Sequence, residues 1–129
     1  MNVGTVLWVA AGGAVGSAAR YLSMSFIGQA AGTAFPWGTL FVNIAGSFVM
    51  GLLVELGALI WQPSADIRAF LAVGMLGGFT TFSTFSLDVA VMAERHDWLV
   101  AALYIVLSVS LSVGALFLAM ALVRQWAVG

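Results

Sequence analysis

Charged residues are scarce in this chain of 129 residues, and cysteine is absent. Charged side chains make up 7% of the residues, against about 25% in ordinary soluble domains. A water-soluble fold is therefore excluded, and the net charge of −1 excludes a basic surface for nucleic acid. The lack of cysteine excludes disulfides and thiolate metal sites. The lone histidine, His96, stands beside Asp97 with no nucleophile or ligand cluster near it, so we expect no enzyme.

Hydrophobic residues make up 63% of the chain, and they are arranged in long runs. About 20 apolar residues are needed to cross about 30 Å of hydrocarbon as a helix. The pattern predicts an all-α membrane protein, a single domain over residues 1–129, with transmembrane helices at 3–27, 38–61, 67–93 and 98–126. The two prolines fall between these segments, and tryptophans typical of membrane interfaces stand near their ends: Trp37, Trp61, Trp98 and Trp126. The first run is longer than a signal-peptide core, so we expect it to be retained.

The third segment contains a stretch, residues 77–86, that is a poor helix former. Gly77 and Gly78 are followed by Thr80 and Thr81, and both residue types disfavour helix. Backbone groups freed inside a membrane must find partners or line a cavity. The stretch therefore predicts a helix broken at its centre. Two interpretations fit: a kinked helix packed on a neighbour through small residues, or an ion or substrate site.

Aromatic and hydroxyl side chains are concentrated around this predicted break. Phe82 and Phe85 share a face of the helix. The third segment also carries the hydroxyl groups of Ser83 and Thr84. In the fourth segment, the hydroxyl groups of Tyr104, Ser108 and Ser112 form one stripe along the helix. Membrane serines often bond back to their own helix, and phenylalanines often fill cores. Their convergence on a broken helix nevertheless favours a pore lining.

Two polar residues lie at unusual depth in the first two segments. Arg20 precedes the end of the first segment by several residues. It either reaches the membrane surface with its long side chain or faces an aqueous vestibule. Asn43 is either a hydrogen-bonding link between helices or a neutral donor for an anion. Because the first segment ends where the second begins, the two residues are predicted at similar depth, which favours a shared vestibule.

The basic residues show no bias toward either side of the predicted membrane. Arg68 and Arg124 fall on the side of the two termini, and Arg20 and Arg95 on the other. Orientation in a membrane follows the excess of Lys and Arg on one side, and here there is none. Such a chain can insert either way up, which permits an antiparallel dimer.

These patterns together resemble the Fluc (CrcB) family of fluoride channels over essentially the whole chain. The resemblance is carried by residues 38–43, residues 77–86, and the stripe of Tyr104, Ser108 and Ser112. It implies a dual-topology antiparallel homodimer of four-helix subunits in the bacterial inner membrane, with two pores that export fluoride. Asp88 stands where some family members have Glu.

The resemblance also implies roles for individual residues. Phe82 and Phe85 would present ring edges to fluoride, and Asn43 would donate to it at the base of a vestibule. The hydroxyls of five residues would extend the pore: Ser83, Thr84, Tyr104, Ser108 and Ser112. Backbone carbonyls of Gly77 and Thr80, from both subunits, would hold a structural sodium ion.

Two other functions remain to be separated from a fluoride channel. A dual-topology small multidrug exporter would need a membrane-embedded carboxylate to bind its cationic substrate and protons, and Glu55 is the only acid deep enough to consider. A non-transporting membrane assembly subunit would use its glycines only for packing. The hydroxyl stripe and Asn43 argue against this third possibility.

Overall fold

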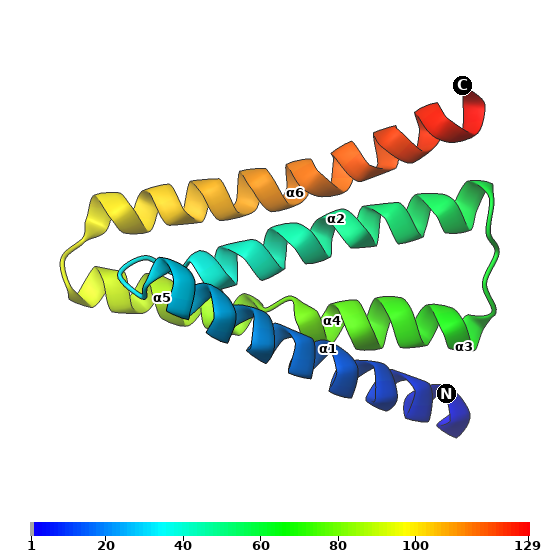
Figure 1. The fold of residues 1–129 in the computed structure, drawn as a ribbon, viewed down its shortest axis with the longest axis horizontal. Coiled ribbons are helices and arrows are strands. Elements are labelled where there is room, and N and C mark those ends of the chain that lie inside the picture. The colour runs from blue at the N-terminus through cyan, green and yellow to red at the C-terminus, as the bar shows by residue number, and fades with distance from the viewer. Residues whose placement is uncertain (1) are drawn as a thin grey trace.

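The computed structural model describes residues 2–129, and all the regular structure in this range is helical. Four long helical segments run side by side, and the third consists of several consecutive pieces (Figure 1). The elements are α1 (Val3–Ala31), α2 (Trp37–Leu59), α3 (Ala65–Arg68), η1 (Ala69–Leu76), α4 (Gly77–Phe79), α5 (Phe82–Glu94) and α6 (Trp98–Val128). The predicted all-helical fold is therefore confirmed for the described residues.

Local chemistry fixes the ends of several helices. The Asn2 side chain accepts a hydrogen bond from the Gly4 amide at 2.8 Å, which caps the start of α1. Gly32, with φ of +82°, ends this helix in a conformation that favours glycine. The helix thus reaches Ala31 instead of the predicted residue 27. Ser64 caps α3 in the same way as Asn2 caps α1, through the Ile67 amide at 3.3 Å.

The chain crosses the length of the molecule in alternating directions. The N-terminus, the connection between α2 and α3, and the C-terminus lie at one end, and the other two connections lie at the opposite end (Figure 1). Arg68 in α3 and Arg124 near the end of α6 therefore belong to the first end, and Arg95 after α5 belongs to the second. These three arginines lie at the ends that the charge comparison assigns to them.

Three helical segments are long and apolar enough to cross a membrane: Trp37–Leu59, Ala65–Glu94 and Trp98–Val128. The protein is therefore a membrane protein. The 29-residue α1 is not in this set. Its glycines, its small polar residues and Arg20 make it less apolar than the others.

The low apolar content of α1 has a packing explanation. This helix lies against η1, a stretch of π-helix, so closely that backbone touches backbone. A Cβ atom on Gly12 would overlap the Phe70 carbonyl oxygen, and one on Gly16 would overlap that of Met75. A Cβ on Gly74 would lie 2.6 Å from the Val9 carbonyl oxygen. Small residues at these positions allow the close approach that is typical of membrane helices.

Substitution of Gly16 should therefore separate α1 from the third segment. We expect Gly16→Ala to abolish recovery of folded protein or to lower its thermal midpoint clearly, because its methyl group would meet the rigid Met75 backbone. Gly28→Ala is the matched control, since its Cβ would lie 3.8 Å from the Thr33 methyl group, an ordinary contact. Size-exclusion chromatography and thermal unfolding in detergent would measure both. Equal behaviour of the two variants would contradict this packing.

The second close contact joins α2 and α6 along their length. A Cβ on Gly51 would overlap the Leu116 carbonyl oxygen. Farther along, the buried Glu55 accepts hydrogen bonds from Arg124 Nε at 3.1 Å and Nη2 at 3.2 Å. A hydrophobic cluster where α2, α5 and α6 meet holds the opposite half together: Leu40, Phe85, Met92, Ala101 and Tyr104.

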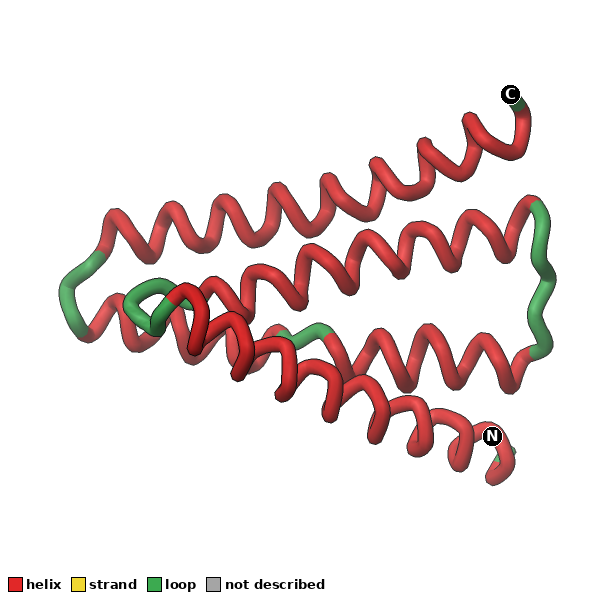
Figure 2. Tube along the Cα trace, in the orientation of Figure 1, coloured by secondary structure: helices red, strands yellow, loops and turns green. Residues whose placement is uncertain are grey.

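The third segment is interrupted by two extended residues, Thr80 and Thr81, which show as a short loop between helices in Figure 2. The predicted break is thus present, but it begins after the glycine pair. Gly77 and Gly78 are helical and belong to α4. The interruption comes at the threonines because their backbone and side chains find other hydrogen-bond partners there.

Candidate functional site

Each threonine of the break makes hydrogen bonds that end one helix or begin the next. The amide and the hydroxyl of Thr80 both donate to the Leu76 carbonyl oxygen, at 3.1 and 3.0 Å. The Thr81 hydroxyl oxygen accepts from the Thr84 amide at 3.2 Å and thereby caps α5. A threonine at the N-cap, the position directly before a helix, commonly accepts a hydrogen bond from the amide three residues on. The start of α5 is therefore encoded locally, by the Thr81 cap.

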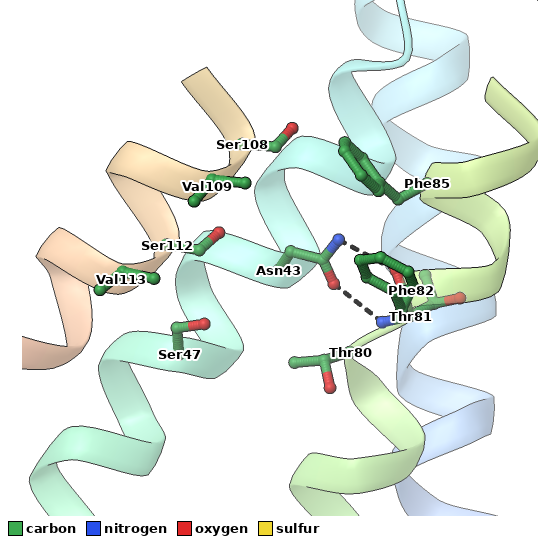
Figure 3. Close-up of a pocket in the computed structure, with 10 residues that line it drawn as sticks. All are labelled: Asn43, Ser47, Thr80, Thr81, Phe82, Phe85, Ser108, Val109, Ser112 and Val113. Carbon is green, nitrogen blue, oxygen red and sulfur yellow. Dashed lines mark hydrogen bonds between the residues drawn. The ribbon is translucent and has the colours of Figure 1, made fainter. Parts of the chain in front are cut away.

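Asn43 of α2 binds the backbone of the break, at Thr81, with its side-chain amide (Figure 3). Its Oδ1 accepts from the Thr81 amide at 2.8 Å, and its Nδ2 donates to the Thr81 carbonyl oxygen at 3.0 Å. The same residue satisfies both backbone groups of Thr81, as a chain break inside a membrane requires. The amide nitrogen carries a second hydrogen. Asn43 is therefore both a link between helices and a remaining donor.

Arg20 of α1 binds the backbone of α4 shortly before the break. Its Nε donates to the Gly78 carbonyl oxygen at 3.0 Å. Arg20 does not line the pocket that contains Asn43. The two residues do lie at a similar level of the molecule, because the residues they bind, Gly78 and Thr81, are three positions apart in the chain.

Among residues 2–129, two carbonyl groups at or shortly before the break accept no hydrogen bond. The bonds that cross this region engage the carbonyls of Leu76, Gly78 and Thr81. None engages the carbonyl of Gly77 or of Thr80. Within residues 2–129, no cluster of three or more His, Cys, Asp or Glu side chains is placed to bind a metal. The unpaired carbonyl oxygens are hard, uncharged ligands of the type that suits a monovalent cation.

A pocket of about 290 Å³ opens between α2, the break, α5 and α6 (Figure 3). No charged side chain lines it. Its lining comprises Asn43, Ser47, Thr80, Thr81, Phe82, Phe85, Ser108, Val109, Ser112 and Val113. The Oγ atoms of Ser108 and Ser112 are buried there, and no group in the described part of the chain is their hydrogen-bond partner. Buried hydroxyls normally have a partner, so these two are available to a bound species.

The two phenylalanines of the pocket differ in their surroundings. Their ring centroids are 5.5 Å apart with an interplanar angle of 45°. Phe85 is 8% exposed and packs on Tyr104, whereas Phe82 is 77% exposed. Because the Phe82 ring is exposed, nothing within the single chain covers the pocket on that side.

Some predicted pore residues lie outside this pocket. Tyr104 is fully buried, and its hydroxyl donates to Asp88 Oδ2 at 2.8 Å. Ser83 and Thr84 flank the cap of α5, where the Ser83 and Thr81 hydroxyl oxygens are 3.4 Å apart. The pocket therefore brings together one part of the predicted set: Asn43, Phe82, Phe85, Ser108 and Ser112.

Two polar pocket residues had not been singled out from the sequence. Thr81 caps α5 and is held by Asn43, and Ser47 lies in α2. Ser47 follows Asn43 by four residues, so helical spacing alone places both on one face. The capping role of Thr81 could have been predicted from its residue type, because threonine is favoured at the position directly before a helix.

Comparison with known proteins assigns the chain to a family. Residues 7–120 match the family model described as CrcB-like protein, Camphor Resistance (CrcB). The chain belongs to the CrcB family. The matched range of this CrcB protein contains the break, Asn43 and the serines of α6.

CrcB relatives of high similarity carry a common name. The protein named fluoride-specific ion channel FluC from Rhodospirillum centenum is 56% identical over 119 residues, which cover 92% of this chain and 94% of the relative. A protein of the same name from Chelativorans sp. is 55% identical over 120 residues, covering 93% and 96%. A third, from Agrobacterium fabrum, is 52% identical over 117 residues, covering 91% and 94%.

Proposed function

We propose that this CrcB protein is a fluoride-selective channel that exports fluoride from the cytoplasm across the bacterial inner membrane. The name of its relatives gives the ion. The observation that carries the proposal is the pocket beside the break, in which unpaired serine hydroxyls, two phenylalanine rings and no charged side chain meet. The protein is accordingly a transporter and not an enzyme.

This lining suits a small anion that must pass and not stay. Fluoride is strongly hydrated, so the pocket must replace water with other donors. Ser108 and Ser112 offer hydroxyls, and Asn43 offers its second amide hydrogen. The rims of Phe82 and Phe85 carry positive partial charge. Because conduction needs binding that is strong enough for entry and weak enough for exit, a lining without Lys or Arg favours flux.

The remaining predicted residues would extend the path beyond the pocket. Tyr104 lies next to Phe85, with ring centroids 5.1 Å apart. Its hydroxyl and those of Ser83 and Thr84 would continue the line of hydrogen-bonding groups along α5 and α6. Arg20 would add positive potential at the vestibule, since none of the described carboxylates lies within ion-pair distance of it.

The channel would be an antiparallel homodimer in which α1 is the fourth transmembrane helix of each subunit. The exposed face of Phe82 supports this, because a second copy would close the open side of the pocket. The balanced arginines permit both orientations in one membrane. Around a two-fold axis, identical groups from both copies converge.

A structural sodium ion would lie at that axis. The unpaired carbonyls of Gly77 and Thr80 fit such an ion, and the two copies together would supply four of them. The ion would supply positive charge that offsets the repulsion between these oxygens. The residues that hold it would be the same ones that border the fluoride pocket, so the assembly and the pore would depend on one backbone geometry.

The structure gives no support to an exporter of cationic drugs. The carboxylate of Glu55, the one considered for that role, is occupied by Arg124. A bacterial strain that lacks its own fluoride exporter separates the functions in cells. The parent protein should restore growth in fluoride and leave sensitivity to cationic dyes unchanged. The reverse pattern would support the exporter.

Dual topology gives a prediction of its own. A C-terminal alkaline phosphatase fusion, active outside the cytoplasm, and a C-terminal green fluorescent protein fusion, fluorescent inside it, should both give signal, because Arg68 and Arg124 on one side balance Arg20 and Arg95 on the other. Three lysines added near the N-terminus should shift the population to one orientation and lower fluoride resistance. Signal from only one of the two parent fusions would contradict dual topology.

A further inference from the structure

Helix α1 holds Gly78, a residue of α4 shortly before the break, at two points. A Cβ atom on Gly78 would lie 2.9 Å from the Gly13 carbonyl oxygen and 3.1 Å from Ser17 Oγ, so its Cα is pressed against α1. The Gly78 carbonyl oxygen accepts the hydrogen bond from Arg20 Nε at 3.0 Å. Gly13, Ser17 and Arg20 are spaced by four and three residues and share a face of α1. This face therefore fixes both the position and the direction of the Gly78 peptide.

The direction of that peptide matters because of its neighbours. Gly77 directly precedes Gly78, and its carbonyl is one of the two unpaired ones. Each peptide unit is planar, so its carbonyl direction is set by the rotations about the flanking Cα atoms. Glycine allows these rotations more freely than any other residue. An unrestrained Gly78 would let the Gly77 carbonyl change direction at low cost.

We propose that Arg20 is a positioning residue for the sodium site. Its Nε–H fixes the Gly78 carbonyl and, through the backbone rotations at Gly78, the direction of the adjoining Gly77 carbonyl. The Thr80 carbonyl is held separately, because it shares a peptide plane with the Thr81 amide that Asn43 binds. This inference rests on the proposed function, since the sodium ion belongs to that proposal. It adds to the vestibule role of Arg20, because the hydrogen bond uses Nε alone and the terminal nitrogens of the guanidinium stay available.

The charge of Arg20 and its hydrogen bond have opposite effects on a nearby cation. A guanidinium is always positive, and like charges repel. Removal of the charge alone should therefore strengthen sodium binding. Removal of the hydrogen bond should weaken sodium binding, because the Gly77 carbonyl loses its alignment. The sign of the change consequently distinguishes positioning from simple electrostatics.

Two neutral substitutions separate these effects. In Arg20→Gln, the side-chain nitrogen stands as many bonds from Cα as Nε does in arginine, so a donor is kept without the charge. Arg20→Met has similar length and is also neutral, but it has no donor. The two variants differ in the hydrogen bond and not in charge. Their comparison isolates the contact with Gly78.

The measurement is the thermal midpoint of the purified dimer, followed by tryptophan fluorescence, as sodium chloride replaces N-methyl-D-glucamine chloride at constant ionic strength. A cation that binds only the folded dimer raises its midpoint. We expect parent and Arg20→Gln to reach half of this rise at the same sodium concentration or, for Gln, at a lower one. For Arg20→Met we expect about a tenfold higher concentration, on the scale of one lost hydrogen bond.

Three results would overturn the inference. The first is an equal sodium dependence of the Arg20→Gln and Arg20→Met variants. The second is loss of the dimer in both variants, because Arg20→Gln keeps the hydrogen-bond donor and should keep the dimer. A parent without any sodium dependence would refute the proposed sodium site separately. In that case the thermal midpoints measured without sodium decide the role of Arg20. A lower midpoint for Arg20→Met than for Arg20→Gln would still support Arg20 as a positioning residue for the break. Equal midpoints of the two variants are the third result, and they would refute that role.

Discussion

Phe82→Ile and Phe85→Ile are each expected to leave a folded dimer and to reduce fluoride flux at least about tenfold, equivalent to about 1.4 kcal/mol of added barrier. An isoleucine has no ring and therefore no positive edge for the anion. Phe82 is 77% exposed in one chain, so its replacement removes little internal packing. Phe85 lies in the hydrophobic cluster, where a substitution of this type should cost under about 1.5 kcal/mol of stability.

The matched control for these variants is Phe26→Ile. Phe26 in α1 is 72% exposed, as Phe82 is, but it lies outside the pocket. We expect this control to keep the parent flux. The measurement is fluoride efflux from liposomes, normalised to the dimer recovered by size-exclusion chromatography. If the folded Ile variants conduct fluoride like the parent, the two phenylalanines serve only in packing and the aromatic lining of the pore is wrong.

Asn43→Asp is expected to have the second large effect, and on two properties. The new carboxylate oxygen would face the Thr81 carbonyl oxygen that Nδ2 now binds at 3.0 Å. A buried carbonyl left without its donor costs about 1–3 kcal/mol, so the thermal midpoint should fall. The negative charge would also repel fluoride within the pocket. Flux per recovered dimer should fall at least about tenfold, which corresponds to about 1.4 kcal/mol.

Gln62→Glu is the control for this substitution, because it makes the same change from amide to carboxylate outside the pocket. It should leave stability and flux unchanged. If Asn43→Asp keeps both the midpoint and the flux of the parent, Asn43 neither holds the break nor meets the ion. Loss of stability with unchanged flux per dimer would leave Asn43 as a link between helices alone.

The sequence predicted the large features of the fold because they follow from composition. Runs of apolar residues that are long enough for a membrane define the helices. The close contact of α1 with η1 was not predicted, because it joins two helices that are far apart in the sequence. The boundary at Ala31 was missed, since it depends on a single residue, Gly32, in the left-handed conformation. The length of an apolar run does not show where a helix is ended by a single glycine.

The site was predicted in part, for a similar reason. The phenylalanines and serines of the pocket were found because helical spacing places them on defined faces. The break was expected at Gly77 and Gly78, where helix propensity is lowest, yet it lies at Thr80 and Thr81. Propensity identifies a weak point, but capping and the bonds from Asn43 decide where the helix ends. Contacts between distant helices, such as that of Arg20 with Gly78, cannot be read from local sequence.

The most direct measurement of the central claim is ion efflux from liposomes that contain only the purified protein. Fluoride and chloride electrodes would follow release of each ion after a potassium ionophore is added to balance charge. A channel of the proposed type should release fluoride rapidly and chloride no faster than protein-free liposomes. Fluoride release no faster than in protein-free liposomes, with the dimer intact, or equal release of both ions, would contradict a fluoride-selective pore.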